Sequence, residues 1–313
     1  MDKKVYFRGK LGCGWYNFTE FLAWLLTYER TSKGVTYDRH IRYGEEKRQY
    51  INIFSRDDLA DVQKPLFIYV HGGGWISGIT DMRNAYVHNF ARAGYFTASL
   101  SYSYAPDKVF PSQIQEICTA VDKVLDIAEG KNVDTTKIVL SGESAGVYYI
   151  FMLAALVADH SLADRLGIEF KHINDFKISA MVAHSGAVKL DKLLDKNCPQ
   201  SGFPDIKMMT CSFLGKPNAE AVKWLKTEEG KLSIPVVNAD FPPTFFATGE
   251  KDRLRFESYD IIKEYEALNI PYDRFEGTGA MGAHAWTIVT KLKQGKECFD
   301  KTSAFLQKIG IEI

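Results

Sequence analysis

Ser144 stands in the segment GESAG at 142–146, after an apolar run that ends at Leu140 and before a second apolar run at 147–156. This is the Gly-x-Ser-x-Gly pattern in a setting typical of a strand, a sharp turn and a helix. A chain that reverses at one residue strains the backbone there, so the residues two positions away must be small. Such a turn exposes the serine hydroxyl to a base. The pattern predicts nucleophilic chemistry at Ser144, and the alternative is a serine–glycine turn without chemistry.

A serine hydroxyl needs a general base at neutral pH, and the base needs a group that orients it. Among seven histidines, His284 lies in a small-residue loop after the last predicted strand, downstream of Ser144, where we expect the base. His184, which ends another predicted strand, is the competitor. The orienting acid should follow the predicted strand 245–248. We favour Asp252 because it lies farther along the loop and can turn toward His284, and Glu250 is the alternative.

Attack on a carbonyl places negative charge on its oxygen, and backbone N–H groups must point at that oxygen. The segment HGGGW at 71–75 follows a predicted buried strand and supplies a loop that can approach closely. Ala145 supplies a further N–H beside Ser144. A phosphate-binding loop fits less well, because neither Gly-Lys-Ser/Thr nor Gly-x-Gly-x-x-Gly is present there.

The elements that would position these residues alternate between strands and helices. The expected strands cover 35–43, 49–54, 65–70, 95–102, 137–140, 178–182, 243–248 and 272–275. The expected helices cover 83–93, 112–129, 147–156, 257–268 and 299–308. This alternation predicts an α/β fold with a mostly parallel sheet of about eight strands and helices on both faces.

Two segments of a single domain spanning residues 1–313 are expected to form a helical cap, within 1–34 and 187–238. In the first, a helix over 15–30 carries an apolar stripe; in the second, a loop of that length without structure would be unusual. We expect their apolar residues to wall a closed acyl pocket: Trp15, Phe18, Leu22, Phe203, Phe213 and Trp224. For the helix over 15–30, whose stripe also includes Leu25 and Leu26, packing on the body is the alternative. Membrane-surface binding is disfavoured, because its polar face lacks a lysine and arginine cluster.

Composition excludes several classes of protein. Hydrophobic residues make up 46% and charged residues 25%, and the formal net charge is zero, which gives no indication of nucleic-acid binding. Five scattered cysteines without Cys-x-x-Cys spacing favour reduced thiols in the cytoplasm over disulfides or a metal site. Residues 1–14 lack the apolar core of a signal peptide, and no apolar run is long enough for a bilayer. We therefore expect no stable membrane insertion and no metal or other cofactor. Whether the protein forms a homodimer is left open by the sequence.

Taken in order, residues 71–75, 142–146, 252–255 and 284 resemble the α/β-hydrolase superfamily, and more narrowly its hormone-sensitive-lipase-like carboxylesterases. The resemblance covers roughly residues 65–310. It implies the α/β-hydrolase fold, with Ser144 as nucleophile, His284 as base and Asp252 as acid. It also implies oxyanion donors at Gly73, Gly74 and Ala145. Glu143, Val147 and the Ala285-Trp286 pair depart from the usual family residues, which bears on substrate preference.

The expected function is a serine carboxylesterase that hydrolyses short-chain acyl esters of small molecules through an acyl-enzyme. An amidase of the same fold, such as an arylformamidase or an acyl-peptide hydrolase, would use an identical triad. A non-catalytic ligand receptor is disfavoured, because such proteins usually lose a triad member and all three candidates are present here.

Overall fold

The structure is a computed structural model that describes residues 2–27 and 34–311. Within these ranges it leaves out the side chains of residues 19, 20, 22–27, 280 and 281. The side chains of Leu22, Leu25 and Leu26, which the sequence placed on an apolar stripe, therefore lie outside the description.

Within the described ranges, eight strands form one sheet in the order β1-β2-β4-β3-β5-β6-β7-β8. β1 pairs with β2 and β2 with β4 in antiparallel fashion, and the remaining pairs are parallel. The strands are β1 (Val35–Arg42), β2 (Tyr50–Arg56), β3 (Lys64–Val70), β4 (Phe96–Leu100), β5 (Val133–Glu143), β6 (Ile178–His184), β7 (Thr244–Gly249) and β8 (Tyr272–Gly277). The predicted mostly parallel sheet is confirmed.

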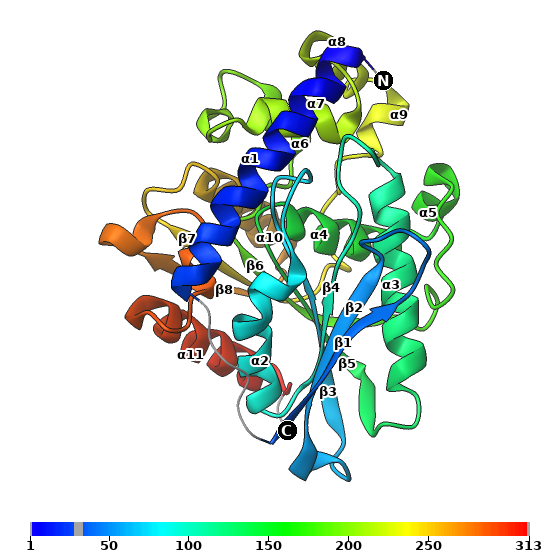
Figure 1. The fold of residues 1–313 in the computed structure, drawn as a ribbon, viewed down its shortest axis with the longest axis vertical. Coiled ribbons are helices and arrows are strands. Elements are labelled where there is room, and N and C mark those ends of the chain that lie inside the picture. The colour runs from blue at the N-terminus through cyan, green and yellow to red at the C-terminus, as the bar shows by residue number, and fades with distance from the viewer. Residues whose placement is uncertain (1, 28–33, 312–313) are drawn as a thin grey trace.

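Helices lie against both faces of this sheet (Figure 1). Those of the main body are α2 (Asn84–Arg92), α3 (Ser112–Ala128), α4 (Ala145–Ala158), α5 (Ser161–Leu166), α10 (Arg255–Leu268) and α11 (Lys293–Lys308). Alternate residues of β3 separate the two layers. Leu66 and Ile68 join a core with α3, α4 and α10, whereas Phe67 and Tyr69 join a core with α2 and α11. This is the side-chain alternation that a strand buried on both faces requires.

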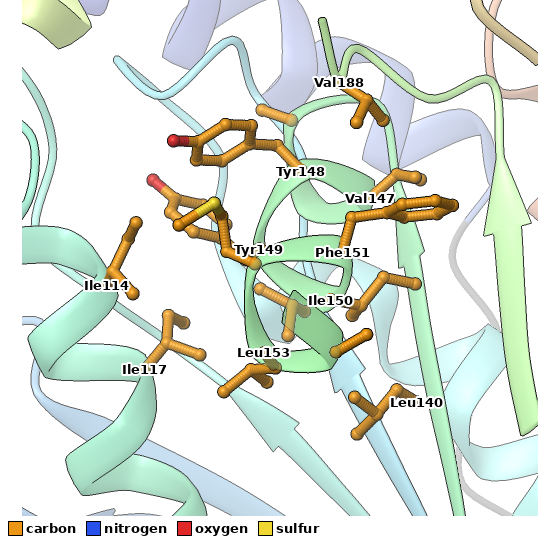
Figure 2. Close-up of a cluster of buried hydrophobic side chains, with 14 of the residues drawn as sticks. Ile114, Ile117, Leu140, Val147, Tyr148, Tyr149, Ile150, Phe151, Leu153 and Val188 are labelled. Carbon is orange, nitrogen blue, oxygen red and sulfur yellow. The ribbon is translucent and has the colours of Figure 1, made fainter. Parts of the chain in front are cut away.

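Helix α4 follows Ser144 directly and lies deep in the larger core (Figure 2). Its residues from Ala145 to Leu156 are buried around the whole circumference. A helix that is apolar on every side belongs in a core. Figure 2 shows Leu140 on one side of α4 and Ile114 and Ile117 of α3 on another. This packing fixes the helix that begins at the candidate nucleophile.

A further group of helices lies mostly at one end of the molecule, and the first of them, α1 (Lys3–Thr27), runs from that end down across the body (Figure 1). The group consists of α1, α6 (Leu190–Leu194), α7 (Ile206–Leu214), α8 (Asn218–Trp224) and α9 (Glu228–Lys231). Helix α1 crosses α7 closely: a Cβ atom on Gly9 would lie 2.8 Å from Ser212 Oγ, and one on Gly12 would lie 2.7 Å from Met208 Cε. The predicted helical insertion is present, and α1 begins well before the predicted start at residue 15.

The expectation that Trp15 and Phe18 wall a closed pocket is wrong. Their exposed fractions are 63% and 55%, because α1 turns its other side toward α7. Phe213 does face inward and stacks on Trp75, with ring centroids 5.1 Å apart. Trp224 is half-buried and packs edge-on against Phe110, with ring centroids 6.1 Å apart.

Candidate active site

Ser144 occupies the turn between β5 and α4 with φ 54° and ψ −119°, a conformation that costs a non-glycine residue energy. The neighbouring glycines make the turn possible. A Cβ atom on Gly142 would lie 2.7 Å from the carbonyl carbon of Gly146, and one on Gly146 would overlap the Val70 carbonyl oxygen. The predicted strand–turn–helix geometry at Ser144 is confirmed, together with its stated reason.

The turn at 184–187 holds Ser144 in place through the backbone. Ser144 donates its N–H to the His184 carbonyl oxygen at 2.8 Å, and its own carbonyl oxygen accepts from the Ala187 N–H at 3.1 Å. The same turn carries Ser185, whose hydroxyl oxygen accepts the Ala285 N–H at 3.3 Å. The 184–187 turn therefore holds the serine turn and the His284 loop beside each other.

The glycine loop at 71–75 lies against the serine turn. A Cβ atom on Gly72 would lie 2.5 Å from the Glu143 carbonyl oxygen and 3.0 Å from Ser144 Cβ. Gly73 and Gly74 adopt φ values of 116° and 58°, a region that favours glycine. Among the described residues, the backbone N–H groups of Gly73, Gly74 and Ala145 donate to no acceptor. They are available for an oxyanion.

His284 and Asp252 are joined by a hydrogen bond of 2.8 Å between Nδ1 and Oδ2. The other Asp252 oxygen accepts the Leu254 N–H at 2.9 Å. Burial by itself would raise the pKa of Asp252. The charge of His284, its hydrogen bond, the Leu254 N–H and the Ser185 hydroxyl together outweigh burial and lower that pKa. Asp252 therefore stays a carboxylate that can orient His284.

The His284 side chain is 25% exposed, and Phe203 packs edge-on against it, with ring centroids 4.6 Å apart. Within the described part of the chain, no hydrogen bond links the Ser144 hydroxyl to the His284 ring. In unliganded sites such catalytic contacts are often long and tighten when substrate binds. The structure thus brings Asp252 to His284 directly, and brings His284 toward Ser144 through the 184–187 turn.

The two alternatives that the sequence offered, Glu250 as the acid and His184 as the base, have other hydrogen-bond partners. Glu250 is exposed and accepts the Gly279 N–H through Oε1 at 2.6 Å. The His184 ring is buried between Tyr86 and Thr287, each at 2.8 Å. Burial lowers the pKa of His184 from 6.5 to about 4. His184 is a neutral, fully engaged core histidine in this arrangement.

Glu143, noted in the sequence as a departure from the family pattern, points into the protein. Its Oε1 lies 2.7 Å from Arg83 Nε, and its Oε2 accepts the Tyr69 hydroxyl. Burial would raise the pKa of Glu143, but Arg83, Tyr69 and the Gly72 N–H outweigh it, so the pKa is lowered. Glu143 thus connects Arg83 and Tyr69 to the Gly72 N–H, and this buried network supports the glycine loop. The residue pattern gave no signal for Arg83 or Ser185, because both act only through contacts made by distant segments.

Other features of the described residues concern cofactors and membranes. No three His, Cys, Asp or Glu side chains converge in a way that could hold a metal ion within these residues. All five cysteines are free thiols. No described helix combines the length and the apolar character that crossing a bilayer requires.

The sheet topology, the strained serine turn and the His284–Asp252 pair define an α/β hydrolase. The BD-FAE family profile matches residues 52–256, more than half of the chain, and the protein belongs to the BD-FAE family. This confirms the superfamily resemblance.

Curated relatives match parts of the chain. Kynurenine formamidase of Drosophila melanogaster is 31% identical over 123 residues, 39% of either chain. Acetyl esterase of Salmonella dublin is 26% identical over 218 residues, which cover 67% of this chain and 62% of that protein. The chain thus spans less than two thirds of these relatives.

Solved structures match over nearly the whole chain. Inhibited esterase B of Lactobacillus rhamnosis superposes with a TM-score of 0.81 at 18% identity, covering 98% of this chain and 97% of that one. An esterase of the bacterial hormone-sensitive lipase family gives 0.67 at 20% identity, with coverage of 94% and 90%. At such identities the likeness shows the fold.

Proposed function

We propose that the protein is a serine hydrolase that cleaves short-chain acyl esters of small molecules. Ser144 acts as the nucleophile, His284 as the general base and Asp252 as its orienting acid. The observation that carries this proposal is the 2.8 Å Asp252–His284 hydrogen bond beside a serine in a strained turn. The esterases among its relatives and structural neighbours support it.

Acylation begins when the Ser144 hydroxyl oxygen attacks the ester carbonyl carbon and His284 Nε2 takes the hydroxyl proton. The imidazolium formed is stabilised by Asp252, whose two oxygens are fixed by His284 and the Leu254 N–H. The carbon–oxygen bond to the alcohol then breaks, and His284 returns its proton to the leaving alcohol. The products of this step are the free alcohol and an acyl-Ser144 ester.

The developing oxyanion would be bound by the N–H groups of Gly73, Gly74 and Ala145, which donate to no acceptor within the described residues. Ala145 is also the first residue of α4, and the positive end of a helix favours negative charge. Removing one such donor typically reduces the rate by about 100- to 1000-fold. A water activated by His284 then attacks the acyl carbon, releases the acid and restores the Ser144 hydroxyl.

Substrate size would be set by the helices that gather over the glycine loop. We assign the cap to α1 and α6–α9, within 1–34 and 187–238, on a single domain. Phe213 of α7 stacks on Trp75, Met209 of α7 contacts Gly74, and Phe203 touches His284. We expect these inner side chains to limit the size of the acyl group that reaches Ser144. We expect p-nitrophenyl esters of about two to six acyl carbons to be the best substrates.

The experiment that tests this function is labelling with a fluorophosphonate probe, followed by peptide mapping. Wild type should be labelled at Ser144. Ser144→Ala should lose labelling, and its kcat on p-nitrophenyl acetate should fall by about 10⁴-fold or more. Ser161→Ala, at an exposed serine of α5, is the matched control and should behave as wild type. Esterase activity that survives in Ser144→Ala would refute the assignment.

An amidase is the second candidate, favoured by the 31% identity with kynurenine formamidase. The same residues would serve both reactions, but an amine leaves less readily and depends more on protonation by His284. Phenyl acetate, acetanilide and formanilide, compared by kcat/KM, separate the two. A preference for formanilide over phenyl acetate would replace the esterase by a formamidase.

A further inference from the structure

Helix α1 exposes a row of large apolar side chains on the side that faces away from α7. The row, here called the outer stripe, has exposed fractions of 64%, 60%, 63% and 55% at Phe7, Leu11, Trp15 and Phe18. Their spacing of four, four and three residues places them along one side of a helix. The opposite side packs on α7 through Gly9 and Gly12. A helix that is apolar on both sides is expected to have both sides covered.

The charges of α1 indicate what covers the outer stripe. Its sequence contains four basic residues, Lys3, Lys4, Arg8 and Lys10, all near its N-terminal end and all exposed, and one acidic residue, Glu20. Positive side chains at a helix N-terminus oppose the helix dipole, so the helix itself gains nothing from them. Lys10 pairs with Asp107 at 2.8 Å. Lys4, Arg8 and Lys207 line a cavity of about 610 Å³ between α1 and α7. Asp2 and Asp205 line it as well, so cations outnumber carboxylates there by only one.

The early start of α1 changes the interpretation made from the sequence. A helix over 15–30 has an apolar face without cations, which disfavoured a membrane surface. The helix in the structure begins at Lys3, so the basic residues and the apolar row belong to one and the same helix. Aromatic and leucine side chains along one side, with Lys and Arg beside them, are typical of helices that lie in the interface of a membrane.

We propose that α1 docks on an anionic lipid surface. The outer stripe enters the boundary between headgroups and acyl chains, with Trp15 near its centre. Lys3, Lys4 and Arg8 contact the headgroup phosphates. This docking would lay the lipid against the side of α1 opposite α7, and α7 in turn carries Met209, which lies against Gly74. The proposal rests on the exposed side of α1 and is independent of the chemistry at Ser144.

A second copy of the chain is the competing occupant. Two copies of α1 packed against each other would cover their outer stripes. Such a pair would leave the basic clusters without acidic partners on the other helix, whose one acidic residue is Glu20. A surface of anionic headgroups offers both the apolar and the negative complement. The charge pattern therefore favours lipid.

The test is sedimentation of the full chain with vesicles of phosphatidylcholine alone, or of phosphatidylcholine mixed with phosphatidylglycerol. Wild type should bind the mixed vesicles, and salt should weaken that binding. Trp15→Glu and Phe18→Glu should each reduce partitioning by about tenfold or more. A triple variant with Lys3, Lys4 and Arg8 replaced by Gln should lose the preference for phosphatidylglycerol. Val236→Glu, at an exposed apolar residue outside α1, is the matched control and should bind as wild type.

Circular dichroism and thermal melting establish that each variant is folded. If a stripe variant does not fold, the triple variant still tests whether the basic residues bind anionic lipid. Absence of binding to either vesicle would overturn the proposal, and so would equal binding by wild type and the stripe variants. Light scattering after size exclusion tests the competing occupant. A wild-type dimer that Trp15→Glu converts to a monomer, without vesicle binding, would make the outer stripe a dimer interface instead.

Discussion

The Nδ1 atom of His284 lies 2.8 Å from Oδ2 of Asp252, whereas Glu250, two residues earlier, accepts the Gly279 N–H. The two carboxylates of this loop therefore have different partners and different roles. We expect Asp252→Asn to reduce kcat by about 10⁴-fold, because His284 loses its orientation and its imidazolium loses a negative partner. Glu250→Gln should reduce kcat far less. Initial rates on p-nitrophenyl acetate measure both, and the reverse ranking would show that Glu250 is the orienting acid.

The buried ion pair beneath the glycine loop should matter for stability. Arg83 and Glu143 have side chains that are 18% and 2% exposed. Arg83→Met leaves a buried carboxylate without its cation, and we expect the free energy of unfolding to fall by about 3–5 kcal/mol. The double variant Arg83→Met with Glu143→Gln should recover much of this loss. Urea denaturation measures the difference.

A surface pair provides the control for Arg83. Lys296 and Asp300 are 71% and 58% exposed, so Lys296→Met should change the free energy of unfolding by less than about 1 kcal/mol. If Arg83→Met is as mild as Lys296→Met, the buried pair does not support the glycine loop in the way inferred.

Close packing at the serine turn predicts a sharp difference between two glycines. A Cβ atom on Gly146 would overlap the Val70 carbonyl oxygen, a backbone atom that cannot move aside. We expect Gly146→Ala to destabilise the fold by about 3 kcal/mol and to reduce esterase activity. A Cβ atom on Gly14 of α1 would meet nothing within 4 Å, so Gly14→Ala should stabilise by up to about 1 kcal/mol. Thermal melts that rank the two variants alike would contradict this.

Three buried groups predict how stability depends on pH. Burial lowers the pKa of His71 and of His184 from 6.5 to about 4, and raises the pKa of Glu257 from 4.5 to about 7. As pH falls from about 6.5 toward 4.5, the unfolded chain gains two histidine protons that the folded chain does not take. Over the same range Glu257 is protonated in the folded chain and ionised in the unfolded chain, which opposes one histidine. The free energy of unfolding therefore falls by about 1.4 kcal/mol for each unit by which the pH falls in this range.

Two variants separate these contributions, because they should act in opposite directions. His184→Gln removes one histidine and should flatten the slope of unfolding free energy against pH. Glu257→Gln removes the opposing group and should steepen it. Urea denaturation at several pH values between 5 and 7 gives the three slopes, and identical slopes would contradict the stated causes.

The sheet and the serine turn were predictable because their signals are local. Buried parallel strands such as β3 are continuous apolar runs, and the glycines around Ser144 answer a steric demand within five residues. The choice of Asp252 over Glu250 needed only the order of the two residues after β7. The contact between Asp252 and His284 agrees with that choice.

The structural features that the sequence did not predict depend on contacts between distant segments. Residues 3–14 contain Gly9, Gly12 and Gly14, which weaken a helix, yet α1 includes them because two of these glycines allow close approach to α7. The exposure of Trp15 and Phe18 follows from which side of α1 meets α7. No spacing within the segment could decide that. Ser185 and Arg83 likewise gain their roles from residues more than fifty positions away.

The contact between α1 and α7 has a consequence for the order of events during synthesis. Helix α1 ends at Thr27 and its partner begins at Ile206, so the ribosome must make the intervening residues 28–205 first. At about 5–20 residues per second, this interval lasts roughly 10–35 s. During that time both apolar sides of the nascent helix face solvent. Helix α1 is thus made well before the helix on which it packs, and chaperones or a membrane surface would meet it before α7 does.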